Sequence, residues 1–191
     1  MYDDGGFILE GGGRAVLLLG DFGMSSQELR PLAEALRRGG FTVNAPAVFE
    51  PGEDWTAWLR EAREAFMRLR DTHVSVALCG LGAGIDLALM LAEFCPVDRL
   101  LLAPRLASPM PTRARLSLRA LERRAARSLF ALTEEPVILL DETAQGAAPR
   151  EARRLSRMLG RCVIMGFRDS LALAALRQLN AANAPSEARA D

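Results

Sequence analysis

The sequence predicts an α/β protein whose mainly parallel sheet of about six to seven strands carries helices on both faces. Three observations lead to this class. Short apolar runs alternate along the chain with longer stretches of helical period. The runs are continuously apolar, as in strands that are buried on both faces of a parallel sheet. Glycine-rich turns follow two of them. The alternation predicts right-handed crossovers and three layers.

The first elements follow from local patterns. A short edge strand is expected at 7–9 and a buried strand at 15–19. Ser25 and Glu28 have the spacing of a capping box, which predicts the start of a helix. The glycines at 39–40 end this helix.

The next strand is expected at 41–45, and the helix after it at about 54–70. This helix carries Trp55 and Trp58 on its apolar face at helical spacing. We interpret both tryptophans as core or pocket wall in preference to a recognition surface. The same patterns predict the later elements: a strand at 99–103, a helix at about 115–131, a strand at 137–140, a helix at 149–159, a strand at 162–165 and a helix at about 169–182.

The composition favours one domain over 1–183, with a small polar tail at 184–191. Half of the 191 residues are hydrophobic, which is enough for a full core. The 24 acidic residues balance the 24 basic ones, so no overall field favours nucleic acid or an anionic membrane. Every basic residue of this count is arginine, which excludes a Schiff-base or lysine general-base mechanism.

No apolar run approaches the roughly 18 residues of a membrane span, and the start of the chain lacks a basic signal segment. We therefore expect a cytoplasmic protein. Cys79, Cys95 and Cys162 are widely spaced in apolar segments, as reduced thiols would be. With His73 as the one histidine, we expect no metal site and no cofactor.

The most informative stretch is 74–89. Its apolar run ends in Gly80, Gly82 and Gly84, and a pattern of helical period follows at once. Strand, sharp turn and helix in this order form the geometry of a nucleophile elbow, whose pattern is G-x-S-x-G. Here the central residue is Gly82, which has no side chain to attack a substrate.

The chain resembles the α/β-hydrolase family, in particular its small carboxylesterase-like and monoacylglycerol-lipase-like members. The resemblance extends over most of 15–181 and leaves room for little or no cap domain. It rests on these stretches: 17–25 (LLLGDFGMS), 32–36 (LAEAL), 40–46 (GFTVNAP), the elbow, 96–104 (PVDRLLLAP), 135–140 (EPVILL) and 149–155 (PREARRL).

The resemblance implies a triad of serine, acid and histidine, with an oxyanion hole made by two backbone N–H groups. Carried over to this sequence, the serine position is Gly82. The acid belongs near Asp141, slightly after it along the chain, and the histidine position reads Arg168. His73 precedes the elbow strand, which predicts that it lies at the opposite end of the sheet. Ordinary triad esterase activity is therefore not expected.

The backbone around Gly82 is expected to persist. Glycine adopts a positive φ without the strain that a serine bears there. The N–H groups of Phe22 and Ala83 should still converge as a vestigial anion-binding notch, from which Asp21 would repel an anion. We predict a ligand site at this edge formed by Asp21, Phe22, Gly82, Ala83 and Asp169.

Other interpretations of the same residues are weaker. A dinucleotide-binding loop would need a small residue where Ile85 stands. Cys79 lies inside the strand without a histidine, as an inert core thiol would. Asp141, Glu142 and Asp169 are candidates for an acid–base pair. However, Asp169 opens the last helix, and an N-cap is the simpler role.

One helix face carries a row of arginines at a spacing of four residues. A solvated face is the simplest interpretation, and a surface for an acidic protein partner is the alternative. The row consists of Arg115, Arg119, Arg123 and Arg127.

These observations leave three hypotheses about function. The first is a non-catalytic protein of hydrolase fold, a pseudoenzyme that binds a small ligand or a protein partner at the former active-site edge. The second is a carboxylesterase-like hydrolase that acts on a small ester through a non-standard set of residues. The third is a structural subunit that acts through the arginine row.

Overall fold

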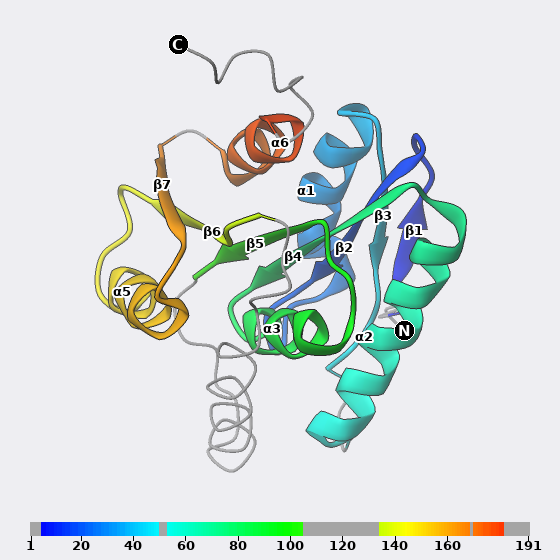
Figure 1. Ribbon diagram of the computed structural model, residues 1–191, viewed down its shortest axis with the longest axis horizontal. Helices are drawn as coiled ribbons and strands as arrows, with labels where there is room; N and C mark the ends of the chain where they lie inside the picture. Colours follow the sequence, from blue (N-terminus) through cyan, green and yellow to red (C-terminus); the bar gives the residue numbers. More distant parts are fainter. Residues whose placement is uncertain (1–4, 50–52, 105–133, 169, 182–191) are drawn as a thin grey trace.

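The computed structural model describes residues 5–49, 53–104, 134–168 and 170–181. Figure 1 shows the elements along the chain. The strands are Phe7–Leu9 (β1), Arg14–Leu19 (β2), Phe41–Ala45 (β3), Ser75–Leu81 (β4), Arg99–Ala103 (β5), Val137–Asp141 (β6) and Val163–Phe167 (β7). The helices are Ser26–Arg38 (α1), Trp55–Thr72 (α2), Gly84–Phe94 (α3), Ala147–Leu159 (α5) and Leu171–Ala181 (α6).

The seven strands form one sheet in the order β1-β3-β2-β4-β5-β6-β7. β1 pairs antiparallel with β3 at one edge, and the other neighbouring pairs are parallel. The mainly parallel sheet and its strand number are as the sequence predicts. The expected helix at 115–131, with its arginine row and the place of a cap, lies outside the described residues, and so does the expected tail at 184–191.

Helices cover both faces of the sheet, which gives the expected three layers (Figure 1). α1 and α6 pack on one face, and α2, α3 and α5 pack on the other. α1 shows why: its buried residues Leu29, Ala33 and Leu36 recur at helical spacing on one side. Its start is fixed as expected, because the N–H of Ser25 donates to the Glu28 carboxylate at 2.9 Å.

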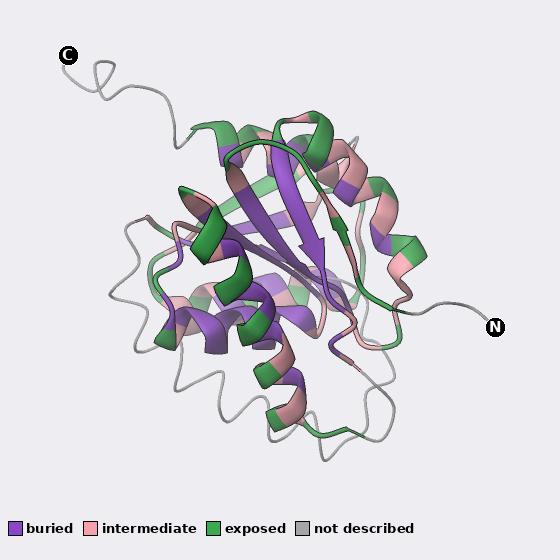
Figure 2. Cartoon of the chain, turned by 90° about the vertical axis from the view of Figure 1, so that its right-hand side faces the viewer, coloured by how far each residue is buried: buried purple, intermediate pink, exposed green. Residues whose placement is uncertain are grey.

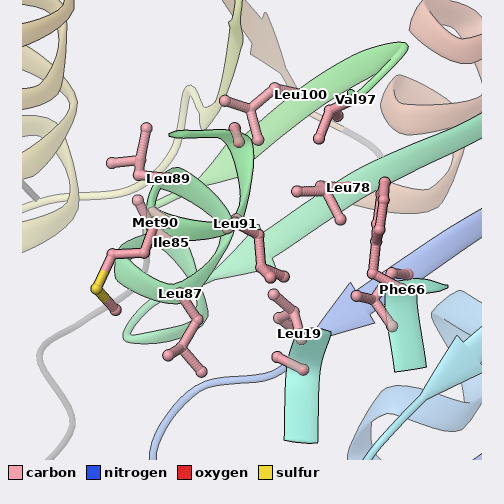
Figure 3. Close-up of a cluster of buried hydrophobic side chains, with 14 of the residues drawn as sticks. Leu19, Phe66, Leu78, Ile85, Leu87, Leu89, Met90, Leu91, Val97 and Leu100 are labelled. Atoms are coloured by element: carbon pink, nitrogen blue, oxygen red, sulfur yellow. The ribbon is translucent and has the colours of Figure 1, made fainter. Parts of the chain in front are cut away.

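The core is deepest around the central strands and α3, which are drawn largely in the buried colour in Figure 2. Leu17 and Leu19 of β2 and Leu78 of β4 are fully buried. Most residues of α3 are buried as well, because this helix is apolar on nearly all sides. Leu91 of α3 and Phe66 of α2 belong to the same cluster (Figure 3). This packing holds the start of α3 firmly against the sheet.

None of the helices in the described part of the chain has both the length and the apolar character that crossing a membrane requires.

Candidate functional site

The register of two neighbouring strands brings Asp21 and Gly82 together. β2 and β4 are parallel, and Leu19 is paired with Gly80. Asp21 and Gly82 each follow two residues later, so both lie at the carboxyl edge of the sheet. From β2 the chain passes to β3 on one side, and β4 lies on the other side of β2. This is a topological switch point, where ligands of α/β sheets bind.

The glycines of the elbow act as the sequence predicts. Gly82 has a φ of +55°, a conformation that favours glycine. A Cβ on Gly84 would lie 2.2 Å from the carbonyl oxygen of Leu19, and one on Gly80 would lie 2.7 Å from that of Gly84. Only residues without a side chain allow α3 to start this close to β2 and β4.

The two backbone donors of the expected notch do converge, and they converge on Asp21. Oδ1 of Asp21 accepts a hydrogen bond from the N–H of Phe22 at 2.8 Å and another from the N–H of Ala83 at 2.8 Å. The side chain is buried, and the residue is 6% exposed. Its charge lies beside the positive end of α3, where a carboxylate is stabilised.

The Asp21 carboxylate also takes the space above the elbow. A Cβ on Gly82 would lie 2.1 Å from Cγ of Asp21, and 2.2 and 2.3 Å from its two oxygens. The expectation of a notch that Asp21 guards by repulsion therefore needs correction. The notch forms, but the chain's own carboxylate fills it, because Asp21 stands directly across from Gly82 on the adjacent strand.

Asp141, near which the resemblance places the acid, begins a turn. Oδ1 of Asp141 accepts hydrogen bonds from the N–H of Thr143 at 2.8 Å and from its hydroxyl at 2.7 Å. The bond from the Thr143 hydroxyl, followed by that from its N–H, lowers the pKa of Asp141. These bonds assign Asp141 to a turn after β6, which is a structural role.

Arg168, at the position where the resemblance places the histidine, forms an ion pair. Arg168 follows β7, and its Nε donates to the carboxylate of Glu142. The Glu142 side chain lies against Gly166, where an added Cβ would be 2.3 Å from Oε1 of Glu142. Asp169, the remaining residue of the predicted ligand site, lies outside the described residues. The Ser170 hydroxyl accepts from the N–H of Ala172 at 3.2 Å at the start of α6.

His73 lies at the other end of the sheet, as predicted. It ends α2 and precedes β4, whereas Gly82 follows β4. Its Nδ1 is 3.0 Å from the carbonyl oxygen of Leu69 and 2.9 Å from the Thr72 hydroxyl. The imidazole therefore belongs to the end of a helix.

Cys79 is fully buried in β4, and burial raises the pKa of its thiol to about 12. This agrees with the interpretation of an inert core thiol. Cys95 is also buried, and desolvation raises its pKa too. Within the described ranges, no three His, Cys, Asp or Glu side chains come together as metal ligands do.

Sequence reasoning missed an aromatic cluster beside this edge. The ring of Phe49 lies 5.7 Å from that of Phe22 and 5.1 Å from that of Trp58, between ring centroids. Trp58 is buried, so its interpretation as core or pocket wall is confirmed. Phe49 lies in the irregular loop after β3, and no periodicity marks a contact between such a loop and α2.

A cavity of about 200 Å³ opens next to Asp21. Ser25 at the end of the loop after β2 and Ser26 at the start of α1 form one wall, and Val48 and Phe49 of the loop after β3 form the other. Sequence reasoning did not select these four residues. The capping pattern explained Ser25 locally, and nothing in the sequence shows that the two loops face each other.

The sheet order, the elbow and the two helix layers define the α/β-hydrolase fold. Solved structures of this fold superpose on nearly the whole chain. One of two metagenome-derived lipolytic enzymes, LipS and LipT, is 17% identical with a TM-score of 0.73, over 94% of this chain and 97% of that one. The monoacylglycerol lipase of Paleococcus ferrophilus is 17% identical with a TM-score of 0.67, over 93% and 99%.

Est1E from Butyrivibrio proteoclasticus is 10% identical with a TM-score of 0.66, over 92% of this chain and 91% of that one. At such identities the likeness concerns the fold. No protein-family model and no curated protein sequence matches the chain.

Proposed function

We propose that this chain is a non-catalytic protein of the α/β-hydrolase fold that binds a small ligand at the former active-site edge. The observation that carries the proposal is the position of the Asp21 carboxylate. It accepts the N–H groups of Phe22 and Ala83 and covers Gly82. Acyl transfer needs a nucleophile and free donors for the developing oxyanion. The elbow offers neither.

The electrostatics of the edge favour a ligand that donates hydrogen bonds. Oδ1 of Asp21 receives two N–H groups, and no hydrogen bond to Oδ2 is seen from the described residues. Ser25 and Ser26 line the same cavity of about 200 Å³. A carboxylate retains several acceptor positions, whereas it repels another anion. A small amine or alcohol therefore fits this cavity better than a carboxylic acid does.

The first test is a search for turnover. Purified protein is incubated with nitrophenyl acetate, butyrate and octanoate, and release of nitrophenol is followed. The expected result is a rate equal to that of buffer. Saturable turnover that Gly82→Ala abolishes, in a variant shown by circular dichroism to be folded, would overturn the proposal in favour of a hydrolase with a non-standard set of residues.

The second test is ligand stabilisation. The melting temperature is measured with ethanolamine, 1-propanol and acetate, for the wild type and for Asp21→Ala. We expect the amine or the alcohol to stabilise the wild type and acetate to stabilise only the variant, whose two N–H groups are free. Stabilisation of the wild type by acetate would contradict the filled notch. The absence of any shift with the amine and the alcohol would contradict the ligand class.

A further inference from the structure

A second cavity lies away from the elbow, beneath the antiparallel edge of the sheet. It has a volume of about 460 Å³, within the range of small-molecule sites. β1 and α2 border it, and these elements lie side by side at the right of Figure 1. The loop residues Pro46, Ala47 and Val48 separate it from the cavity beside Asp21, since they line both.

Asn44 and Trp58 both line this cavity, and each carries a buried side-chain nitrogen without a partner among the described residues. Nδ2 of Asn44 and Nε1 of Trp58 make no hydrogen bond with any described residue. Asn44 is 3% exposed and Trp58 is 4% exposed. A buried donor without an acceptor costs about 1–3 kcal/mol, so such groups are normally satisfied. Two of them on residues that line one cavity point to an occupant that supplies acceptors.

The fold explains how the two donors come to the same place. Phe41, Val43 and Ala45 of β3 belong to the cluster under α1, so the alternation of the strand directs Asn44 to the opposite face. Trp58 belongs to the cluster of that opposite face, one turn into α2. The wall is otherwise apolar near these donors, with Val48 and Pro46 buried beside them.

The charges of the cavity wall balance. Glu53 and Arg60 are exposed, and so is Arg68, whose guanidinium lies 3.8 Å from the carboxylate of Glu61. The wall thus carries two carboxylates and two guanidiniums, so it selects no net charge. The two buried donors are neutral amide and indole N–H groups. They require an acceptor oxygen, and the surrounding side chains require an apolar body.

We propose that this cavity is a second ligand site, which takes a small neutral molecule with a carbonyl oxygen, such as an amide or a ketone. The carbonyl oxygen accepts the N–H groups of Asn44 and Trp58, and the apolar part packs against Pro46 and Val48. The site does not depend on Asp21 or Gly82, and its occupation involves no covalent step. It is therefore independent of the function proposed above.

Nuclear magnetic resonance of the indole N–H groups gives the direct test. The chain has two tryptophans, so Trp55→Phe leaves the signal of Trp58 alone. Trp55 does not line this cavity, which makes the variant a matched control. The probe is benzamide, with benzoate and benzylamine as charged analogues. We expect benzamide to move the Trp58 signal downfield and saturably, and the two analogues to bind at least tenfold more weakly.

Asn44→Leu separates a ligand site from a structural role. The leucine removes an unsatisfied donor and keeps the branched shape of the side chain, so the melting temperature should stay equal or rise. Binding of benzamide should weaken about two- to tenfold, which is the effect expected from the loss of one hydrogen bond. Trp58→Phe should give a similar loss by calorimetry while it keeps the aromatic ring.

Three results would overturn the proposal. An unmoved Trp58 signal at millimolar benzamide would mean that water satisfies both donors. Tighter binding of benzoate than of benzamide would contradict a neutral site. A fall of several degrees in the melting temperature of Asn44→Leu would show that Asn44 is needed by the fold itself. A failure here leaves the ester and acetate experiments unaffected, since those report on the elbow.

Discussion

Oδ1 of Asp21 lies 2.8 Å from the backbone nitrogen of Ala83, and the carboxylate stands where a side chain at position 82 would begin. One acidic residue thus accepts both converging N–H groups and fills the space above Gly82. The glycine at 82 and the aspartate at 21 are complementary, because the carboxylate fits only over a residue without a Cβ. Several predictions about stability and reactivity depend on this relationship.

Asp21→Ala should destabilise the protein by about 1.5–3 kcal/mol, because it removes charge-assisted hydrogen bonds to Phe22 and Ala83. Asp21→Asn is the matched control. It keeps an acceptor oxygen without the charge and should lose less. Urea denaturation at pH 7 measures both differences. An Asp21→Ala variant as stable as the wild type would show that the carboxylate is incidental to the turn.

Gly82→Ala should also destabilise the protein, by at least the 1–3 kcal/mol or so that a positive φ costs a residue with a side chain. The clash with Asp21 adds to this cost. The clash disappears in the double variant Asp21→Ala/Gly82→Ala, so its loss should be smaller than the sum of the single losses by about 0.5–3 kcal/mol. Additive losses would mean that the two residues do not share this space.

Gly82→Ser together with Arg168→His should not produce an esterase. The serine hydroxyl would meet the Asp21 carboxylate, and the backbone donors would remain occupied. Nitrophenyl acetate hydrolysis by the folded double variant measures the outcome, with the buffer rate as reference. Turnover that appears in this variant with Asp21 still in place would refute the blocking role of the carboxylate.

The three thiols should differ in reactivity. Cys79 and Cys95 are buried and have raised pKa values, whereas Cys162 is half-buried. With a pKa of about 12, roughly one Cys79 thiol in ten thousand is ionised at pH 8. A disulfide reagent such as DTNB should therefore label one thiol in the native protein and three after unfolding. Cys162→Ser should abolish the native reaction, and rapid labelling of that variant would contradict the burial of the other two.

Thr143→Ala should reveal the turn at Asp141 through its pH dependence. The hydrogen bonds of Thr143 lower the pKa of Asp141 below its ordinary value of 3.8 in the folded state. The bond from the hydroxyl, which the variant removes, therefore stabilises the fold above that value, and this contribution disappears as pH falls through the folded-state pKa. The variant should have a lower urea midpoint than the wild type at pH 7 and an equal one near pH 2. A difference that persists at pH 2 would assign the effect to something other than the carboxylate.

Much of the architecture could be predicted because it is local. The apolar run before Gly80, the three spaced glycines and the helical pattern after them define strand, turn and helix without any distant contact. The strand predicted at 162–165 lies slightly later in the chain, because β7 spans Val163–Phe167. β7 is an edge strand with exposed apolar residues. Its sequence therefore has no pattern of buried and exposed residues that would mark where the strand begins and ends.

The sequence by itself determined the identity of the elements, the glycine at the elbow and the position of His73 before the elbow strand. All three depend on residue order and short-range periodicity. Only the tertiary structure decided that Asp21 fills the notch and that Asn44 and Trp58 meet at one cavity. The first depends on the pairing of β2 with β4, and the second on the packing of α2 against the face of the sheet to which Asn44 points and against Val48 of the loop after β3. Such contacts join residues that are far apart in the chain. They are determined by how the whole core packs, and no local sequence pattern indicates them.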